Sequence, residues 1–245
     1  MLSSLRSPLL RSPATRCMSS YVKSEESFNE VLDWFKQHRA TAVLRTPTSS
    51  ACPKAMSAAI EGGFKICEFT LTTPDALLHM SDFKKEKKYD GQVKFGMGTV
   101  MNTRDCEMAV DAGAEFIISP IMIPEVITWC ASNKIPCLPG CHTPTEAYNA
   151  YLLGAPVQKI FPGVAGNHMW MKAVSAALPM LRLNPTSGVG LENAGDFLDN
   201  GCVGVGLVAP LFDPVMVQEE NWEGIKANAE VVMKGVKACG PYIEK

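Results

Sequence analysis

One lysine lies inside a short apolar segment of strand-like composition, Val-Gln-Lys-Ile-Phe-Pro at residues 157–162. An amine in such a place, here Lys159, costs free energy unless it is paired, neutral or used chemically. Removal from water lowers the pKa of an amine toward neutrality, which lets it attack a carbonyl carbon and form a Schiff base. The alternative is a lysine on the outer, solvated face of the strand.

Other apolar segments carry a carboxylate and several hydroxyl groups. Glu68 lies in Ile-Cys-Glu-Phe-Thr-Leu-Thr-Thr-Pro-Asp, residues 66–75. Because side chains alternate along a strand, Glu68, Thr70 and Thr72 are predicted to share one face. The same alternation pairs Lys159 with Phe161, Met97 with Thr99, and Asn184 with Thr186. If these faces point inward, one lysine, one carboxylate and several hydroxyl groups meet in one cavity.

Eight short apolar runs, separated by helical stretches, recur along the chain. They cover residues 41–45, 64–71, 93–100, 116–120, 136–141, 157–162, 182–186 and 203–208. This number and spacing predict an α/β fold, the (β/α)8 TIM barrel, as a single domain over residues 24–245. A doubly wound sheet is the competing fold, but it normally shows an early Gly-x-Gly-x-x-Gly turn, which this sequence lacks.

Two further helices are expected outside the repeating units. Ser24 can cap an extra N-terminal helix, because Phe28, Val31, Leu32 and Phe35 follow at helical spacing. A last helix, over about residues 222–238, is expected to close the ring. In such a barrel the chemistry lies at the C-terminal ends of the strands, where the candidate residues fall.

Composition excludes several classes of partner. The net charge is −2, and the one cluster of lysines, at residues 84–88, is typical of a solvated helix end, so nucleic-acid binding is not supported. No apolar run is long enough for a membrane helix. The nine cysteines have no Cys-x-x-Cys spacing. Cys137, Cys141 and His142 are close enough in sequence to suggest a metal site. Reduced, buried thiols explain their spacing better.

The first twenty residues differ from the rest of the chain. They contain Arg6, Arg11 and Arg16, six serines and no acid, and the first carboxylate is Glu25. An arginine-rich, serine-rich, acid-free start is typical of an organelle transit peptide without fixed structure, which we expect in residues 1–20. Mitochondrial import is the first choice and a plastid the second. The alternative is a start that is merely disordered.

Several segments together resemble one enzyme family. Beside those of Lys159 and Glu68, they are Gly-Thr-Val at residues 98–100, Pro-Gly-Cys-His-Thr-Pro-Thr-Glu at 139–146 and Asn-Pro-Thr-Ser-Gly-Val at 184–189. In this order they resemble the class I aldolases that cleave 2-keto-3-deoxy-6-phosphogluconate (KDPG) and 4-hydroxy-2-oxoglutarate (KHG). The likeness covers about residues 28–236.

The resemblance implies a role for each candidate near the reacting carbon. Lys159 would form the Schiff base with a 2-keto acid, and Glu68 would transfer protons. Thr99 and Thr186 would bind the substrate carboxylate, beside Phe161. Thr72 stands where many members carry an arginine, so pyruvate affinity would depend more on hydroxyl groups and backbone amides.

The resemblance also implies a site for a distal phosphate. Family members bind it with backbone amides after the seventh and eighth strands, here Ser187, Gly188, Gly206 and Leu207, and with an arginine that Arg45 matches. Leu207 stands where a serine is often found, so we expect one side-chain donor to be missing from this site.

The implied reaction is the Entner–Doudoroff step, in which KDPG is cleaved to pyruvate and glyceraldehyde 3-phosphate without a metal or other cofactor. A KHG aldolase or oxaloacetate decarboxylase would use the same Schiff base. A metal-dependent aldolase would need paired carboxylates on neighbouring strand ends, which the sequence does not offer. A non-catalytic barrel that binds keto acids would have no use for a desolvated amine. The family also implies a homotrimer.

Overall fold

Eight parallel strands form one sheet in a computed structural model that describes residues 21–86, 88–163 and 167–244. The predicted transit peptide lies outside the described residues. The strands are β1 (Ala40–Leu44), β2 (Ile66–Thr70), β3 (Lys94–Gly98), β4 (Phe116–Ser119), β5 (Cys137–Cys141), β6 (Gln158–Ile160), β7 (Leu183–Pro185) and β8 (Val205–Leu207). Each expected run coincides with one strand, although most strands are shorter than the run and β1 begins one residue before it.

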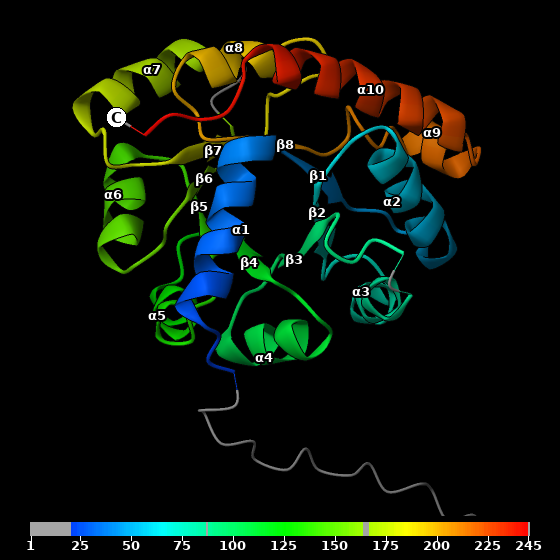
Figure 1. The fold of residues 1–245 in the computed structure, drawn as a ribbon, viewed down its shortest axis with the longest axis horizontal. Helices are drawn as coiled ribbons and strands as arrows, with labels where there is room; N and C mark the ends of the chain where they lie inside the picture. The colour runs from blue at the N-terminus through cyan, green and yellow to red at the C-terminus, as the bar shows by residue number, and fades with distance from the viewer. Residues whose placement is uncertain (1–20, 87, 164–166, 245) are drawn as a thin grey trace, which may run out of the picture.

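Helices surround the strands on the outside, as Figure 1 shows. They are α1 (Glu25–His38), α2 (Cys52–Glu61), α3 (Ala76–Lys85), α4 (Thr103–Asp111), α5 (Pro124–Ser132), α6 (Pro144–Leu152), α7 (His168–Ala177), α8 (Ala194–Asp199), α9 (Pro214–Gln218) and α10 (Trp222–Ala238), with the 3-10 helix η2 (Ser49–Ala51) before α2. The last helix spans the residues expected for it, and it runs beside α2 and α8.

The strand order β7-β6-β5-β4-β3-β2-β1-β8 leaves one seam, between β7 and β8. There the backbone N–H of Val203, just before β8, donates to the carbonyl of Leu183 at 2.9 Å. The sheet therefore curves into a nearly closed barrel, and the predicted (β/α)8 fold is confirmed.

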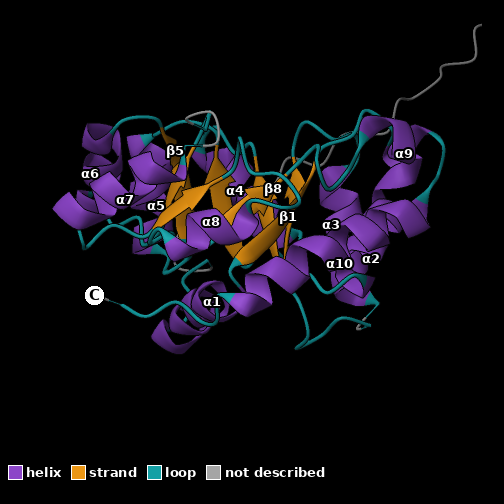
Figure 2. Cartoon of the chain, turned by 90° about the horizontal axis from the view of Figure 1, so that it is seen from above, coloured by secondary structure: helices purple, strands orange, loops and turns teal. Residues whose placement is uncertain are grey.

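The first helix covers the end of the barrel where the strands begin. Ser24 caps it, since its hydroxyl accepts from the Ser27 amide at 3.0 Å. Its buried residues, Val31, Leu32 and Phe35, pack on apolar side chains inside the barrel that include Phe116. Figure 1 shows α1 crossing the ring of strands, and Figure 2 shows it below them. Because α1 fills this end, the opposite end is left for a site.

The larger core lies between the strands and the outer helices. Alternation sends one side chain of each strand into this core and the next into the barrel interior. In β2, Phe69 belongs to the outer core and Glu68 faces the interior. No helix among the described residues is long and apolar enough to span a membrane.

Candidate active site

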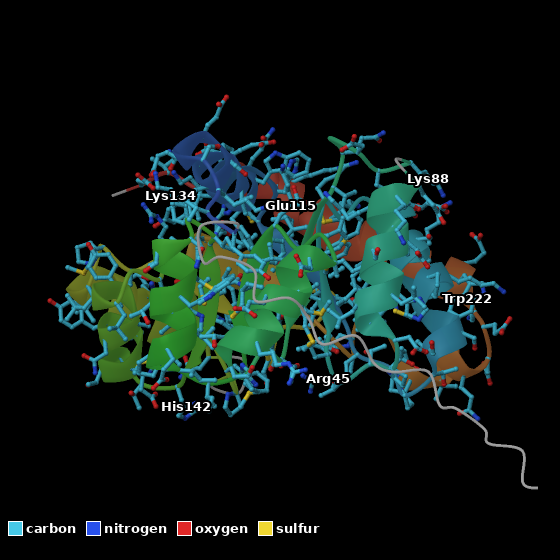
Figure 3. The ribbon with its side chains drawn as sticks, turned by 90° about the horizontal axis from the view of Figure 1, so that it is seen from below. Arg45, Lys88, Glu115, Lys134, His142 and Trp222 are labelled. Carbon is cyan, nitrogen blue, oxygen red and sulfur yellow. The ribbon has the colours of Figure 1, made fainter. Side chains whose placement is uncertain are left out.

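A cavity of about 470 Å3 opens where the strands end, on the side away from α1. Figure 3 shows Arg45 and His142 at this edge and Lys134 and Glu115 near the opposite one. The cavity is lined by Val43, Arg45, Lys159, Phe161, Thr186, Ser187, Gly188, Val189, Gly190, Asn193, Gly206, Val208, Ala209 and Pro210. The lining therefore includes seven of the residues that the sequence singled out.

Lys159 lies in the middle of β6 and points into the barrel, with 7% of its side chain exposed. Its Nζ is 3.9 Å from Oε1 of Glu68 and 5.2 Å from the ring centroid of Phe161. Burial lowers the pKa of Lys159, Arg45 lowers it further, and Glu68 opposes both. The neutral amine, the form that attacks carbonyl groups, is favoured as a result.

Glu68 reaches the same point from β2, and its side chain is 2% exposed. Burial raises the pKa of this carboxyl above its usual range, while the charges of Lys159 and Arg45 act in the opposite direction. Its Oε1 has no hydrogen-bond partner among the described residues. A carboxyl with a raised pKa and an unoccupied oxygen, facing an amine, is suited to give and take protons.

A glycine makes room for this carboxyl. A Cβ added at Gly98, the last residue of β3, would lie 1.8 Å from Oε1 of Glu68. No side chain fits in that space, so the absence of one at position 98 allows Glu68 to point toward Lys159.

Thr72 does not reach the cavity. It is exposed, and its hydroxyl donates to that of Thr70 at 3.2 Å. The alternation that would place Thr72 beside Glu68 ends with the strand, because β2 stops at Thr70. The structure thus places Thr72 beside the site and not in its lining.

Thr99 approaches the site by a route that strand alternation misses. Met97, its expected neighbour on one face, lies in the outer core instead. The chain turns at Thr99, whose φ of 61° is in the left-handed region. This turn brings the Thr99 hydroxyl to 3.4 Å from Nη2 of Arg45, so the expected pairing with Met97 is wrong.

Thr186 and the turn after β7 form one wall of the cavity. Asn184 and Thr186 are both buried and share the inward face, as alternation predicts. Gly206 on β8 faces them, since a Cβ there would lie 2.7 Å from the Thr186 hydroxyl. The turn continues through Ser187 and Gly188 along the cavity.

Sequence reasoning missed Asn193, which also lines the cavity. Its Oδ1 accepts from the Gly190 amide at 2.7 Å, and its Nδ2 donates to the Gly188 carbonyl at 3.3 Å. The available signal was an asparagine just before a helix, which is a common capping residue. In the fold, its side chain instead holds the turn that contains Gly188.

Leu207 is placed differently from the expectation. It has no exposed surface and packs in the outer core, outside the cavity lining. The inward positions nearby are Gly206 and Val208. The idea that a serine at position 207 would add a donor to the cavity is therefore wrong, because that side chain points to the helices.

Cys137, Cys141 and His142 do not form a ligand cluster. Both cysteines are buried thiols, and Nδ1 of His142 lies 3.0 Å from the Pro162 carbonyl. Within the described ranges, no three His, Cys, Asp or Glu side chains are grouped so as to hold a metal ion.

The arrangement has counterparts in known proteins. The family model described as "KDPG and KHG aldolase" matches residues 31–228. The chain belongs to this family. It is therefore an aldolase, a lyase that acts on carbon–carbon bonds, and the prediction of an enzyme is confirmed.

Relatives of this aldolase are 30% and 33% identical to it over the residues that align. The 2-dehydro-3-deoxy-6-phosphogalactonate aldolase of Escherichia coli K12 is 30% identical over 182 residues, which are 74% of this chain and 88% of that protein. The 2-dehydro-3-deoxy-phosphogluconate aldolase of Pseudomonas aeruginosa is 33% identical over 138 residues, 56% of this chain and 61% of that protein.

Solved structures match nearly the whole barrel. A "native KDPGal" structure has a TM-score of 0.74 and 28% identity, and the match covers 82% of this aldolase and 95% of that chain. The KDPG aldolase of Legionella pneumophila, with pyruvate captured as a covalent carbinolamine intermediate, has a TM-score of 0.70 and 25% identity over 81% of this chain and 95% of that one.

Proposed function

We propose that the enzyme cleaves a 2-keto-3-deoxy-6-phospho sugar acid, with KDPG as the first choice, to pyruvate and glyceraldehyde 3-phosphate. The observation that carries this proposal is the buried pair of Lys159 and Glu68, 3.9 Å apart, whose lysine lines the same cavity as Arg45. The amine is the covalent nucleophile, the carboxyl transfers protons, and the guanidinium attracts the distal phosphate.

The reaction begins with the bond between the lysine and the substrate. Nζ of Lys159 attacks the C2 ketone, and the carbinolamine that results loses water to form an iminium ion. Glu68 gives the proton that the leaving hydroxyl needs, which its raised pKa permits.

Cleavage follows from the positive charge on nitrogen. A base takes the proton of the C4 hydroxyl, the C3–C4 bond breaks, and its electron pair moves to C3 to give an enamine while the aldehyde leaves. Glu68 serves as this base, directly or through one water. Protonation of the enamine at C3 and addition of water then release pyruvate from Lys159.

Other residues in or beside the cavity can hold the two ends of the substrate. We assign the keto-acid carboxylate to the hydroxyls of Thr99 and Thr186, beside Phe161. We assign the phosphate to Arg45 and to the backbone around Ser187, Gly188 and Gly206. Relatives that act on phosphorylated sugar acids, including the E. coli protein, support a phosphorylated substrate.

Trapping with borohydride tests the covalent step. Incubation with pyruvate and borohydride should leave a reduced adduct that peptide mapping places on Lys159, and Lys159→Arg should abolish it. Turnover should persist in EDTA. An adduct on Lys172, or activity lost with the chelator, would contradict the mechanism.

Relative kcat/KM values test the substrate. KDPG, its C4 epimer and unphosphorylated KHG should be compared in one assay, because relatives named for each type of substrate are about equally similar. We expect both phosphorylated acids to exceed KHG. A preference for KHG or for oxaloacetate would make the enzyme a general keto-acid aldolase.

We also propose that the enzyme works as a homotrimer, as the family resemblance implies. One solved structure with a similar fold is a protein cage designed by fusing symmetric oligomeric domains. Light scattering after size exclusion should give a mass of three chains, and a monomer would contradict the proposal.

A further inference from the structure

We propose that Thr70 and Thr73 are positioning residues for Arg45, and that they determine preference for a phosphorylated substrate. Arg45 lies just beyond β1, at the cavity, where an unrestrained loop would let its guanidinium move. The two threonines bind the backbone on both sides of it. The inference rests on the proposed function, since it takes Arg45 as the residue that binds the distal anion.

The contacts form one directed chain of hydrogen bonds. The Thr46 amide donates to Oγ1 of Thr73 at 3.2 Å, and Oγ1 of Thr70 donates to the Leu44 carbonyl at 3.0 Å. The two hydroxyls are 3.2 Å apart. Thr70 has one proton and gives it to Leu44, so Thr73 must be the donor between the hydroxyls.

This chain of hydrogen bonds begins at the amide of Thr46, just after Arg45, and ends at the carbonyl of Leu44, just before it. Its two threonines are buried, at 0% exposure for Thr70 and 2% for Thr73, so water does not compete for the bonds. The Thr72 hydroxyl also donates to the Thr70 hydroxyl, and this bond occupies the second acceptor site of Thr70. Bonds linked in this way strengthen one another, and the loss of one leaves a buried group unpaired.

A second set of contacts joins the same two loops further out. Oγ of Ser49, in η2, donates to Oδ2 of Asp75 at 2.7 Å and lies 2.9 Å from Nε2 of His79. Asp75 holds a φ of 58°, which costs a non-glycine residue free energy and persists only where the surroundings enforce it. The loop after β1 is therefore attached at two levels, first to the end of β2 and the loop after it, and then to Asp75 and His79 at the start of α3.

The side chain of Arg45 extends from this fixed backbone toward the cavity. Its Nη2 donates to the Thr99 hydroxyl at 3.4 Å, and its charge lowers the pKa of Lys159. The charged groups that act on Lys159 are Arg45 and Glu68. The neighbouring strands place Gly140 and Asn184, which carry no charge, beside it. A displaced Arg45 should thus change both phosphate binding and the amine.

The test compares Thr73→Val with Arg45→Ala and with the double variant. Thr73→Val should lower kcat/KM for KDPG about ten-fold or more and lower it much less for KHG. The double variant should be no worse than Arg45→Ala alone, because the threonine acts through the arginine. The rate of borohydride trapping falls at low pH as Lys159 becomes protonated. This fall should begin at a higher pH in Thr73→Val, as it should in Arg45→Ala.

Further variants separate this effect from a loss of folding. Thr73→Ser, which keeps the hydroxyl, should retain the KDPG preference, and Thr70→Val should lose it as Thr73→Val does. Thr128→Val, on the surface of α5, removes a hydroxyl that bonds only backbone carbonyls and should change nothing. Equal losses on both substrates, or losses that add to that of Arg45→Ala, would overturn the inference.

Calorimetry with inorganic phosphate separates failure of the inference from failure of the proposed function. Phosphate should bind the native enzyme about ten-fold more tightly than either Thr73→Val or Arg45→Ala. This measurement needs no turnover, so it holds even if no pyruvate adduct forms. Binding that Arg45→Ala weakens and Thr73→Val leaves intact would exclude the positioning role.

Discussion

At the scale of single residues, the reactive centre consists of Lys159 and Glu68, and burial of either one alone would cost free energy. Burial disfavours the charge on Lys159 and on Glu68, so it lowers the pKa of the amine and raises that of the carboxyl. Both shifts favour the neutral forms, which are an amine that can attack a carbonyl and a carboxyl that can donate a proton.

Replacing Glu68 by glutamine should separate proton transfer from binding. The amide keeps the size of the carboxyl but cannot carry a proton between steps. We expect kcat to fall by about 10² to 10⁴, while pyruvate can still be trapped on Lys159 by borohydride. A variant in which only KM rises would show that Glu68 binds substrate and does not transfer protons.

Removing the charge at Arg45 should change the pH dependence of Schiff-base formation. The guanidinium lowers the pKa of Lys159, so Arg45→Ala raises that pKa and leaves more of the amine protonated at a given pH. The acid limb of the trapping rate should therefore shift to higher pH. Arg104→Ala, at an exposed position of α4, is the control, and an unshifted limb in Arg45→Ala would show that its charge does not reach the amine.

At the scale of elements, the ends of the strands decide which side chains meet. β3 ends in Gly98, which leaves space for the Glu68 carboxyl, and the next residue turns the chain toward Arg45. β8 directs Gly206 inward and Leu207 outward. A shift of one residue in either strand would exchange its core and cavity faces.

A methyl group at position 98 should impair catalysis. Because the added Cβ would lie 1.8 Å from Oε1, Gly98→Ala must displace the Glu68 carboxyl from Lys159. We expect kcat to fall by about two orders of magnitude, as for loss of the acid–base group. Gly235→Ala in α10, where the added Cβ meets nothing within 4 Å, should leave kcat unchanged. Equal kcat values for the two variants would show that the Glu68 carboxyl can move aside without losing its contact with Lys159.

Serine at position 207 should destabilise the barrel without helping the phosphate. Leu207 is fully buried in the outer core, so Leu207→Ser loses apolar contacts and buries a hydroxyl. The free energy of unfolding should fall by about 2 to 5 kcal/mol. Denaturant titration measures this fall, with Leu207→Ile as the volume-conserving control. A higher kcat/KM for KDPG in the serine variant would show that position 207 faces the substrate after all.

At the scale of the whole molecule, one end of the barrel is closed by packing and the other end holds the active site. The chain between the start of α1 and β1 fills one end with apolar side chains, and the loops at the other end surround the cavity. Tyr242, near the C-terminus, also binds the α1 side, where its amide donates to the Lys36 carbonyl at 2.8 Å. Helix α1 and the C-terminal segment around Tyr242 therefore lie at the end opposite the chemistry.

We propose that residues 1–20 direct the enzyme to mitochondria and can be removed without loss of activity. A reporter fused to residues 1–30 should enter mitochondria, because an arginine-rich, acid-free segment is read by the import machinery. A chain that starts near Ser19 should keep full kcat/KM. Staining of plastids would favour the second choice, and cytosolic staining would contradict organelle import.

Much of this protein was determined by local sequence. Eight apolar runs predict the barrel because each parallel strand must bury both faces, and Ser24 with its apolar pattern predicts α1. A lysine and a glutamate inside such runs predict the reactive pair, since burial is what alters their pKa values.

Tertiary structure decided what depends on where strands end and how loops meet. Alternation does not show that β2 stops at Thr70, that the chain turns at Thr99, or that Leu207 faces the helices. The hydrogen bonds from Thr46 through Thr73 and Thr70 to Leu44 join residues more than twenty positions apart. Such contacts depend on the register between β1 and β2, which is set only when the barrel packs as a whole.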